Sequence, residues 1–246
     1  MCVAAIAWHA HPRWRLVAIG NRDELHARPS TPLARYDHVL SGIDEVAGGA
    51  WLGVSEEGRF AIVTNRRGFG APDAQRRSRG ELVSYMLAEG DLPGSPEQFN
   101  PFNYLAVAND RLAYLTTTPE NHAAALGHGV YGVSNGALDE PWPKTLALKH
   151  TLTDWLANDE GSLEPLFAIL RSERLPELGI APVEPSDIAI EPRDTPPFIR
   201  HPLYGTRCST VVTVASDGTG RIAERRFDAA GGVTGDTALD FRWPAA

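Results

Sequence analysis

The sequence has few cysteines, no long apolar run and no excess of positive charge. Its two cysteines, Cys2 and Cys208, have neither a CxxC neighbour nor the spacing of zinc ligands, so we expect no disulfide framework and no metal site. No run of 18 or more apolar residues occurs, and the sequence therefore predicts no transmembrane segment. The net charge of −8 argues against a nucleic-acid partner, because phosphate binding needs a basic surface.

Composition is that of an ordinary globular protein. The chain has 246 residues, of which 43% are hydrophobic and 22% charged, and no low-complexity linker divides it. We therefore expect one domain over 1–246. The first 30 residues carry charge where a signal peptide needs an apolar core, which favours a cytoplasmic protein. The short basic cluster of Arg76, Arg77 and Arg79 is typical of a solvent-exposed loop.

Strand patterns occur at both ends of the chain and are organised as hairpins. The paired runs are Val3 to His9 with Trp14 to Gly20, Ala50 to Val54 with Arg59 to Thr64, and Asn103 to Ala108 with Leu112 to Thr117. Further strands are predicted over Gly129 to Ser134, Ser209 to Ala215, Arg221 to Phe227 and Thr237 to Trp243. Hairpin connections of this kind indicate mainly antiparallel sheet.

Helices are predicted between these strands. One begins at the capping-box pattern Ser78-Arg79-Gly80-Glu81 and ends at Gly90, and two more cover Pro143 to Ala157 and Leu163 to Ser172. Because the strands are apolar on both faces, each sheet needs a cover on two sides. We therefore predict an α+β fold with two facing antiparallel sheets and helices outside, a four-layer αββα sandwich.

Two long segments have little regular pattern. The polar segment from Leu25 to about Val46 is long for a loop in a compact domain, which suggests that it covers something. The proline-rich segment from Pro176 to Pro202 is predicted to be an extended surface connection.

Cys2 is the most informative candidate for chemistry. Removal of Met1 would leave Cys2 with a free amine, so one residue would carry both a nucleophile and its base. A thiol pKa of about 8.5 and an amine pKa of about 7.7 to 8 both lie close to working pH. The alternative is a small buried residue at the start of an apolar strand. Cys208 lies in a similar apolar and hydroxyl-rich setting, and we interpret it as a core thiol.

Hairpin symmetry brings a charged block close to Cys2. If the first two strands pair around the turn at Ala10 to Arg13, the positions of paired residues sum to about 23. Cys2 then faces Asn21 to within one residue, at the start of the block Asn21-Arg22-Asp23-Glu24.

Several ordered blocks resemble one known family. They are Met1-Cys2, Asn21-Arg22-Asp23-Glu24, Gly48-Gly49-Ala50-Trp51-Leu52-Gly53, Thr64-Asn65-Arg66, Ser78-Arg79-Gly80-Glu81-Leu82-Val83, Tyr131-Gly132-Val133-Ser134-Asn135 and Pro141-Trp142-Pro143-Lys144. The resemblance is to the NRDE family, also called the transport and Golgi organisation protein 2 family. It implies a fold similar to that of the N-terminal-nucleophile hydrolases, and a link to the intracellular handling of haem, acyl-coenzyme A or related lipids.

One function that the resemblance implies is hydrolysis of a small non-peptide amide, as in the choloylglycine and penicillin V acylases. Cys2 would attack the carbonyl, and the candidate catalytic residues around it are Arg22, Asp23, Asn65, Asn135 and Arg207. In those acylases two residues separate the early arginine from the aspartate, whereas Arg22 and Asp23 are adjacent. Adjacent side chains on a strand point to opposite faces, so only one of this pair is expected to reach Cys2.

The other function is binding or trafficking of a hydrophobic metabolite, which we favour slightly. The candidate ligand-binding residues are Asn21, Arg22, Asp23, Glu24, Trp51, Asn65 and Arg66. An acyl-coenzyme A would need arginines for its phosphates, and haem, which is possible as a transported ligand, would need a His, Cys or Tyr. The histidines near the N-terminus, His9, His11, His26 and His38, are expected at the surface. No cofactor is required under either hypothesis.

Overall fold

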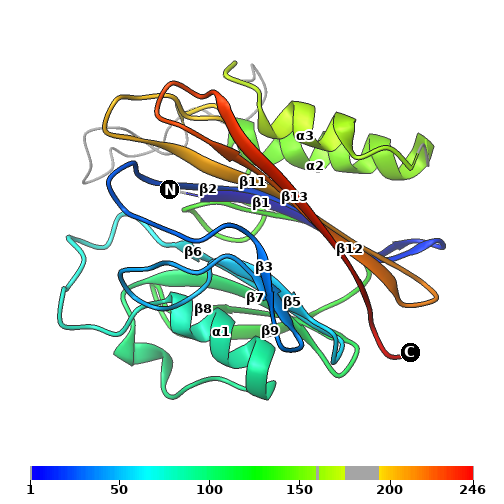
Figure 1. Ribbon diagram of the computed structural model, residues 1–246. Helices are drawn as coiled ribbons and strands as arrows, with labels where there is room; N and C mark the ends of the chain where they lie inside the picture. The colour runs from blue at the N-terminus through cyan, green and yellow to red at the C-terminus, as the bar shows by residue number, and fades with distance from the viewer. Residues whose placement is uncertain (1, 159–160, 175–193, 246) are drawn as a thin grey trace.

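Two antiparallel β-sheets face each other and are covered by helices on their outer sides (Figure 1). The computed structural model describes residues 2–158, 161–174 and 194–245. The predicted four-layer αββα sandwich is confirmed. Most of the proline-rich segment predicted from Pro176 to Pro202 lies outside the described residues.

The first sheet contains both ends of the described chain. Its strands, in spatial order, are β10 (Gly129–Val133), β1 (Cys2–His11), β2 (Trp14–Leu25), β11 (Tyr204–Ala215), β12 (Thr219–Phe227) and β13 (Val233–Arg242). All of its strand pairs are antiparallel. Strand β2 is longer than predicted, because it continues through the whole block from Asn21 to Glu24.

The second sheet is built from consecutive strands. In spatial order these are β3 (Ala34–Tyr36), β4 (Val39–Ser41), β5 (Leu52–Ser55), β6 (Arg59–Asn65), β7 (Phe102–Ala108), β8 (Arg111–Thr116) and β9 (His122–Leu126). The sequence patterns missed β3, β4 and β9. The first two lie in the segment predicted to be a loop. Strand β9 is mostly exposed, and its sequence does not alternate between apolar and polar residues.

Three apolar layers hold the sheets and helices together. Even-numbered residues of β1, such as Ala4 and Ile6, face the second sheet and pack against residues such as Phe60. Odd-numbered residues such as Val3 and Ala5 face the helices α2 (Pro143–Asn158) and α3 (Glu164–Leu170). Helix α1 (Gly80–Glu89) covers the outer face of the second sheet. A strand buried on both faces must be apolar throughout, which explains the continuous run from Val3 to Trp8.

The helix predictions are confirmed with small differences at the ends. Helix α1 ends at Gly90, whose φ of 78° gives the left-handed cap expected of glycine. The capping box is wrong, because Arg79 occupies the cap position without a side-chain cap bond and Glu81 pairs with Arg77 instead. Among the helices in the described ranges, none is long and apolar enough to cross a membrane.

Candidate functional site

Cys2, Arg22 and Cys208 form one row across three neighbouring strands. Cys2 of β1 is paired with Arg22 of β2, and Arg22 is paired in turn with Cys208 of β11. The predicted register is therefore confirmed to within its stated tolerance, with Arg22 rather than Asn21 opposite Cys2. Directly paired residues point to the same face of a sheet, so Cys2, Arg22 and Cys208 share the face toward the second sheet.

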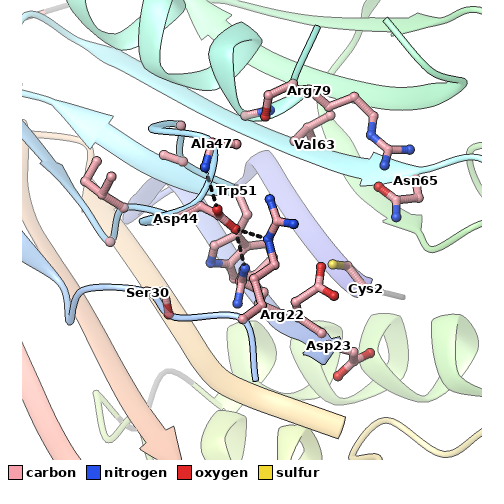
Figure 2. Close-up of a pocket in the computed structure, with 18 of the residues that line it drawn as sticks. Cys2, Arg22, Asp23, Ser30, Asp44, Ala47, Trp51, Val63, Asn65 and Arg79 are labelled. Atoms are coloured by element: carbon pink, nitrogen blue, oxygen red, sulfur yellow. Dashed lines mark hydrogen bonds and ion pairs between the residues drawn. The ribbon is translucent and has the colours of Figure 1, made fainter. Parts of the chain in front are cut away.

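A cavity of about 520 Å³ opens beside this row. Its walls include Cys2, Arg22, Asp44, Trp51, Asn65 and Arg79 (Figure 2). The segment after β2, predicted from its length to cover something, supplies Arg28, Ser30, Thr31 and Asp44 to the wall. The volume lies within the range of about 300–1,000 Å³ that is typical of small-molecule sites.

The Cys2 thiol is nearly buried at the cavity wall. Only 9% of the residue is exposed, and burial raises the pKa of the thiol, as does the nearby carboxylate of Asp23. The backbone N–H of Asp23 and the charge of Arg22 act in the opposite direction on the same pKa. Ser134 of the loop after β10 donates from Oγ to the Cys2 carbonyl at 2.8 Å, which fixes the start of β1.

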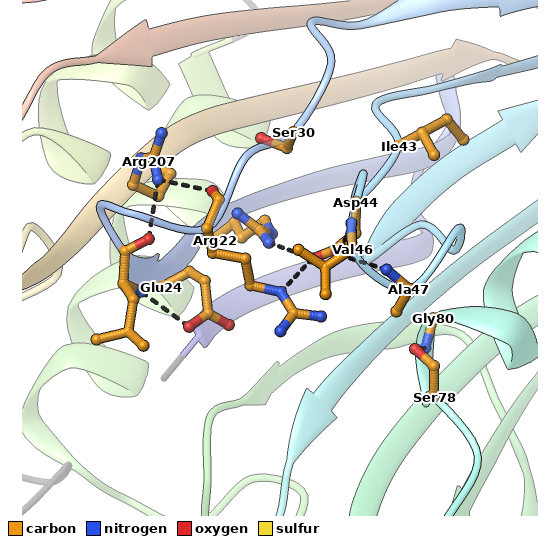
Figure 3. A network of polar contacts seen from close by, with 12 residues as sticks. Arg22, Glu24, Ser30, Ile43, Asp44, Val46, Ala47, Ser78, Gly80 and Arg207 are labelled. Atoms are coloured by element: carbon orange, nitrogen blue, oxygen red, sulfur yellow. Dashed lines mark hydrogen bonds and ion pairs between the residues drawn. The ribbon is translucent and has the colours of Figure 1, made fainter. Parts of the chain in front are cut away.

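Arg22 is engaged by a carboxylate rather than by the thiol. Its Nη2 donates to Asp44 Oδ2 at 2.8 Å, and Arg28 Nε donates to the same oxygen at 2.6 Å (Figure 3). The other carboxylate oxygen accepts from the backbone N–H of Ala47 at 3.0 Å. Burial acts to raise the pKa of Asp44, but these donors and the two guanidinium charges hold it below its ordinary value.

Asp23 lies behind the thiol, where β2 faces the helices. Thr206 of β11 donates from Oγ1 to Asp23 Oδ1 at 2.7 Å. Burial raises the pKa of this carboxyl to about 6, although the charge of the fully buried Lys144 and the Thr206 hydroxyl act to lower it. The prediction that Arg22 and Asp23 point to opposite faces is consistent with their separate partners, while the Asp23 backbone still reaches the sulfur.

Arg79 differs from the other arginines of the cavity. Arg22, Arg28, Arg76, Arg77 and Arg226 each have a carboxylate oxygen within 4.0 Å. Among the described residues no carboxylate lies within that distance of Arg79, whose Nη1 donates only to the carbonyl of Pro101 at 3.2 Å. Burial lowers the pKa of Arg79 to about 10, with the charge of Arg67 acting in the same direction. Figure 2 shows the Arg79 guanidinium, from the cap of α1, beside the side chain of Asn65 at the end of β6.

Two glycines hold Arg79 at this position. A Cβ on Gly49 would lie 2.4 Å from the backbone carbon of Gly80, so only glycine allows the two backbones to meet. The N–H of Ala50 donates to the Gly80 carbonyl at 3.3 Å and to Ser84 Oγ at 3.1 Å, which fastens the start of α1. The sequence-based assignment of this basic cluster to a solvent-exposed loop holds for Arg76 but is wrong for Arg79.

The structure brings six of the predicted site residues to the cavity wall, namely Cys2, Arg22, Asp23, Glu24, Trp51 and Asn65. The remaining four do not line it. Asn21 is buried and donates to the carbonyls of Leu170 and Pro197. Asn135 donates to the carbonyl of Asn65 at 2.8 Å, and so positions that residue from behind.

Arg207 and Arg66 also lie away from the wall of this cavity. Arg207 donates from Nη1 to three carbonyls of the segment after β2, those of Leu25, His26 and Arg28. It therefore shapes the cover of the cavity. Arg66 lines a second cavity on the other side of the end of β6.

Sequence reasoning missed three residues that define the electrostatics of the cavity: Arg28, Asp44 and Arg79. Arg28 and Asp44 lie in the irregular segment after β2, where no pattern fixes a position. The only available signal for Arg79 was the recurrence of glycine in both the Gly48-Gly49 and the Arg79-Gly80 blocks.

Two packed antiparallel sheets with outer helices give this chain a fold like that of the N-terminal-nucleophile hydrolases. The crystal structure of a mutant conjugated bile acid hydrolase from Clostridium perfringens is similar, with a TM-score of 0.51, 9% sequence identity and coverage of 97% of this chain and 92% of that chain. At this identity the likeness concerns the fold alone.

The family follows from the sequence comparisons. The family model described as Transport and Golgi organisation 2 matches residues 1–229, and the chain belongs to this family. The Transport and Golgi organization protein 2 homolog of Bos taurus is 30% identical over 267 residues, with 92% of each chain covered. Its counterpart from Homo sapiens is 29% identical over the same length and coverage.

Proposed function

We propose that the Cys2 cavity binds a small anionic metabolite of the acyl-coenzyme A class. The observation that carries this proposal is Arg79, a desolvated guanidinium that lacks a carboxylate partner among the described residues and faces the cavity. A largely desolvated charge without a counter-ion is unfavourable, whereas a ligand phosphate or carboxylate would pair with it through charge-assisted hydrogen bonds. The acyl end of the ligand would then lie toward Cys2 and Trp51.

Haem fits this cavity less well than an acyl-coenzyme A does. The chain has eight histidines, all within the described residues, and none of them lines the cavity. Tyrosine is also absent from its wall, so among the described residues the sulfurs of Cys2 and Cys208 are the remaining candidates for an axial ligand. Their raised pKa values disfavour the thiolate form that iron binds.

Calorimetric titration of the full chain with octanoyl-coenzyme A tests the proposal. Saturable binding is expected for the wild type, and Arg79→Gln is expected to weaken it by about 10- to 100-fold, since hydrogen bonds to charged groups contribute about 1.5–3 kcal/mol. Arg111→Gln, an exposed arginine on β8, is the matched control and should bind as the wild type does. Absence of saturable binding, or equal affinities of Arg79→Gln and the wild type, would reject the proposal.

A second candidate function is hydrolysis of a small amide by Cys2, supported by one specific contact. The backbone N–H of Asp23 interacts with the Cys2 sulfur, which is the kind of donor that stabilises a thiolate. In this reaction the sulfur would bond to the amide carbonyl carbon, the C–N bond would break as the amine leaves with a proton, and water would cleave the thioester. The side-chain amide of Asn65 on the same wall is the candidate donor to the oxyanion.

Cys2→Ala separates the two functions. A carrier retains its affinity for octanoyl-coenzyme A in this variant, whereas a hydrolase loses all turnover. A hydrolase also requires that iodoacetamide labels Cys2 in the wild type. Cys208→Ala is the matched control, because Cys208 is also buried at the cavity wall. The intact mass of the protein is a further check, because it shows whether Met1 is retained. A retained Met1 leaves Cys2 without a free α-amine, and Cys2 then cannot supply both the nucleophile and the base.

A further inference from the structure

A second cavity lies at the edge of the second sheet, outside the Cys2 site. It has a volume of about 460 Å³ and opens beside β8, β9 and the turn after β10. Its apolar wall is formed by Pro119, Ala124, Leu126, Ala137 and Leu138. The polar side chains of its wall are Arg66, Tyr114, Thr116 and Thr118, together with the exposed Glu120 and His122. An apolar cavity with a few polar groups is typical of a site for an amphipathic small molecule.

Arg66 is the cation of this cavity, and its position follows from the geometry of β6. Successive side chains of an extended chain point to opposite sides, so Asn65 meets the Cys2 cavity while Arg66 meets the second one. Only 11% of the Arg66 side chain is exposed. Burial lowers the pKa of its guanidinium, although Tyr114 and Glu140 act in the opposite direction.

Arg66 is weakly paired within the protein. The nearest carboxylate oxygen, Glu140 Oε2, lies 4.0 Å from Nη1 and already accepts a hydrogen bond from the Ala137 N–H at 2.6 Å. The buried Nε of Arg66 and the buried Oγ1 of Thr118 have no hydrogen-bond partner among the described residues. Buried polar groups are nearly always satisfied, so two unsatisfied groups in one cavity indicate a missing polar partner.

The wall around Arg66 is rigidly built. Tyr114 donates from its hydroxyl to Asn103 Oδ1 at 2.8 Å, and Asn103 donates from Nδ2 to the Gly136 carbonyl at 2.7 Å. This chain of buried hydrogen bonds joins β8, β7 and the turn that carries Ala137 and Leu138. These bonds hold this side of the cavity in place, which lowers the entropic cost of binding there.

We propose that this cavity is a second binding site, for a linear aliphatic monocarboxylate whose carboxylate pairs with Arg66. The hydrocarbon chain occupies the slot between Ala124, Leu126 and Leu138, and the carboxylate supplies the acceptor that Arg66 lacks. Arg66 is the buried charge of this wall, whereas Glu120 is exposed to solvent, and one buried cation matches one carboxylate. Ligands with several phosphates match the arginine-rich Cys2 cavity instead.

Calorimetric titration of the full chain with sodium decanoate tests this assignment. Saturable binding is expected, with 1-decanol and decylammonium binding at least tenfold more weakly than decanoate. Arg66→Gln is expected to weaken decanoate binding by tenfold or more, and Arg66→Lys by less. Ala124→Phe, which fills the slot from β9, should abolish binding, whereas Arg111→Gln should not change it. Circular dichroism and thermal melts verify that each variant is folded.

Three results would overturn the assignment. Equal affinities for decanoate and decanol would show that no carboxylate is recognised. Unchanged binding by both Arg66→Gln and Ala124→Phe would place decanoate elsewhere. Competition between decanoate and coenzyme A that persists in Ala124→Phe would place it in the Cys2 cavity. Binding of octanoyl-coenzyme A and binding of decanoate are measured separately. The proposal for one site can therefore be rejected while the other proposal stands.

Discussion

Cys2 and Arg22 are paired across β1 and β2, yet the Arg22 guanidinium donates to Asp44 at 2.8 Å instead of serving the thiol. The positive charge of Arg22 therefore lies one strand away from the Cys2 sulfur and is neutralised by the Asp44 carboxylate. Burial has the larger effect on the thiol and raises its pKa, while the charge of Arg22 acts to lower it.

Asp44→Asn is expected to make Cys2 more reactive while destabilising the protein. Removal of the carboxylate leaves the charge of Arg22 without its counter-ion one strand away from the thiol, which lowers the thiol pKa. The rate of iodoacetamide alkylation against pH, measured in a Cys208→Ser background, should show its midpoint at lower pH. The free energy of unfolding should fall by about 1–3 kcal/mol, discounted for the partial exposure of the pair. If the alkylation rate depends on pH as in the wild type, the charge of Arg22 does not affect the thiol pKa.

Asp23 is expected to make stability depend on pH in an unusual direction. Its folded pKa of about 6 lies above the ordinary value of 3.8, so the folded state holds a proton that the unfolded state has lost between these values. The free energy of unfolding of the wild type, relative to Asp23→Asn, should therefore fall by about 2–3 kcal/mol as the pH rises from 3.8 to 6. Urea denaturation of both proteins across this range measures the difference. A flat difference would mean that the carboxyl titrates normally.

Gly80→Ala is expected to destabilise the chain, although alanine is the better helix former. A Cβ at Gly80 would lie 3.0 Å from Gly49 Cα, and overpacking of this kind costs about 1–3 kcal/mol. The same change displaces Arg79, so affinity for octanoyl-coenzyme A should fall as well. Gly127→Ala is the control, because its Cβ would meet nothing within 4 Å. A Tm of Gly80→Ala equal to or above that of the wild type would contradict the close approach of Gly80 to Gly49.

Asn21→Ala should affect stability without affecting the ligand. Asn21 donates to two backbone carbonyls and accepts from Ser209 Oγ at 2.6 Å, and all of these groups are buried. Loss of its side chain should lower the free energy of unfolding by about 1–3 kcal/mol. Affinity for octanoyl-coenzyme A, measured at a temperature where the variant is folded, should match that of the wild type. A tenfold loss of affinity would assign Asn21 to the ligand after all.

Local sequence patterns were sufficient to predict the αββα layers but not the charged contacts of the Cys2 cavity. Apolar runs on both faces of β1 and β2 required covers on two sides, and hairpin symmetry placed Cys2 within one residue of its partner. The contacts of Arg22 and Arg79 depend instead on where an irregular segment and a helix start meet in space. No periodicity encodes the approach of Asp44 to Arg22, because the segment that carries it folds against residues distant in sequence.

The row formed by Cys2, Arg22 and Cys208 also limits the redox chemistry of the chain. Each cysteine lies one strand from Arg22, so their Cα atoms are roughly 10 Å apart at the usual strand spacing. A disulfide requires Cα atoms within about 7 Å, and the intervening strand keeps this pair beyond that limit. An oxidant that enters the cavity therefore meets a thiol that cannot join the other cysteine of its own chain. The products open to Cys2 are a sulfenic or higher oxyacid, or a mixed disulfide with a second molecule.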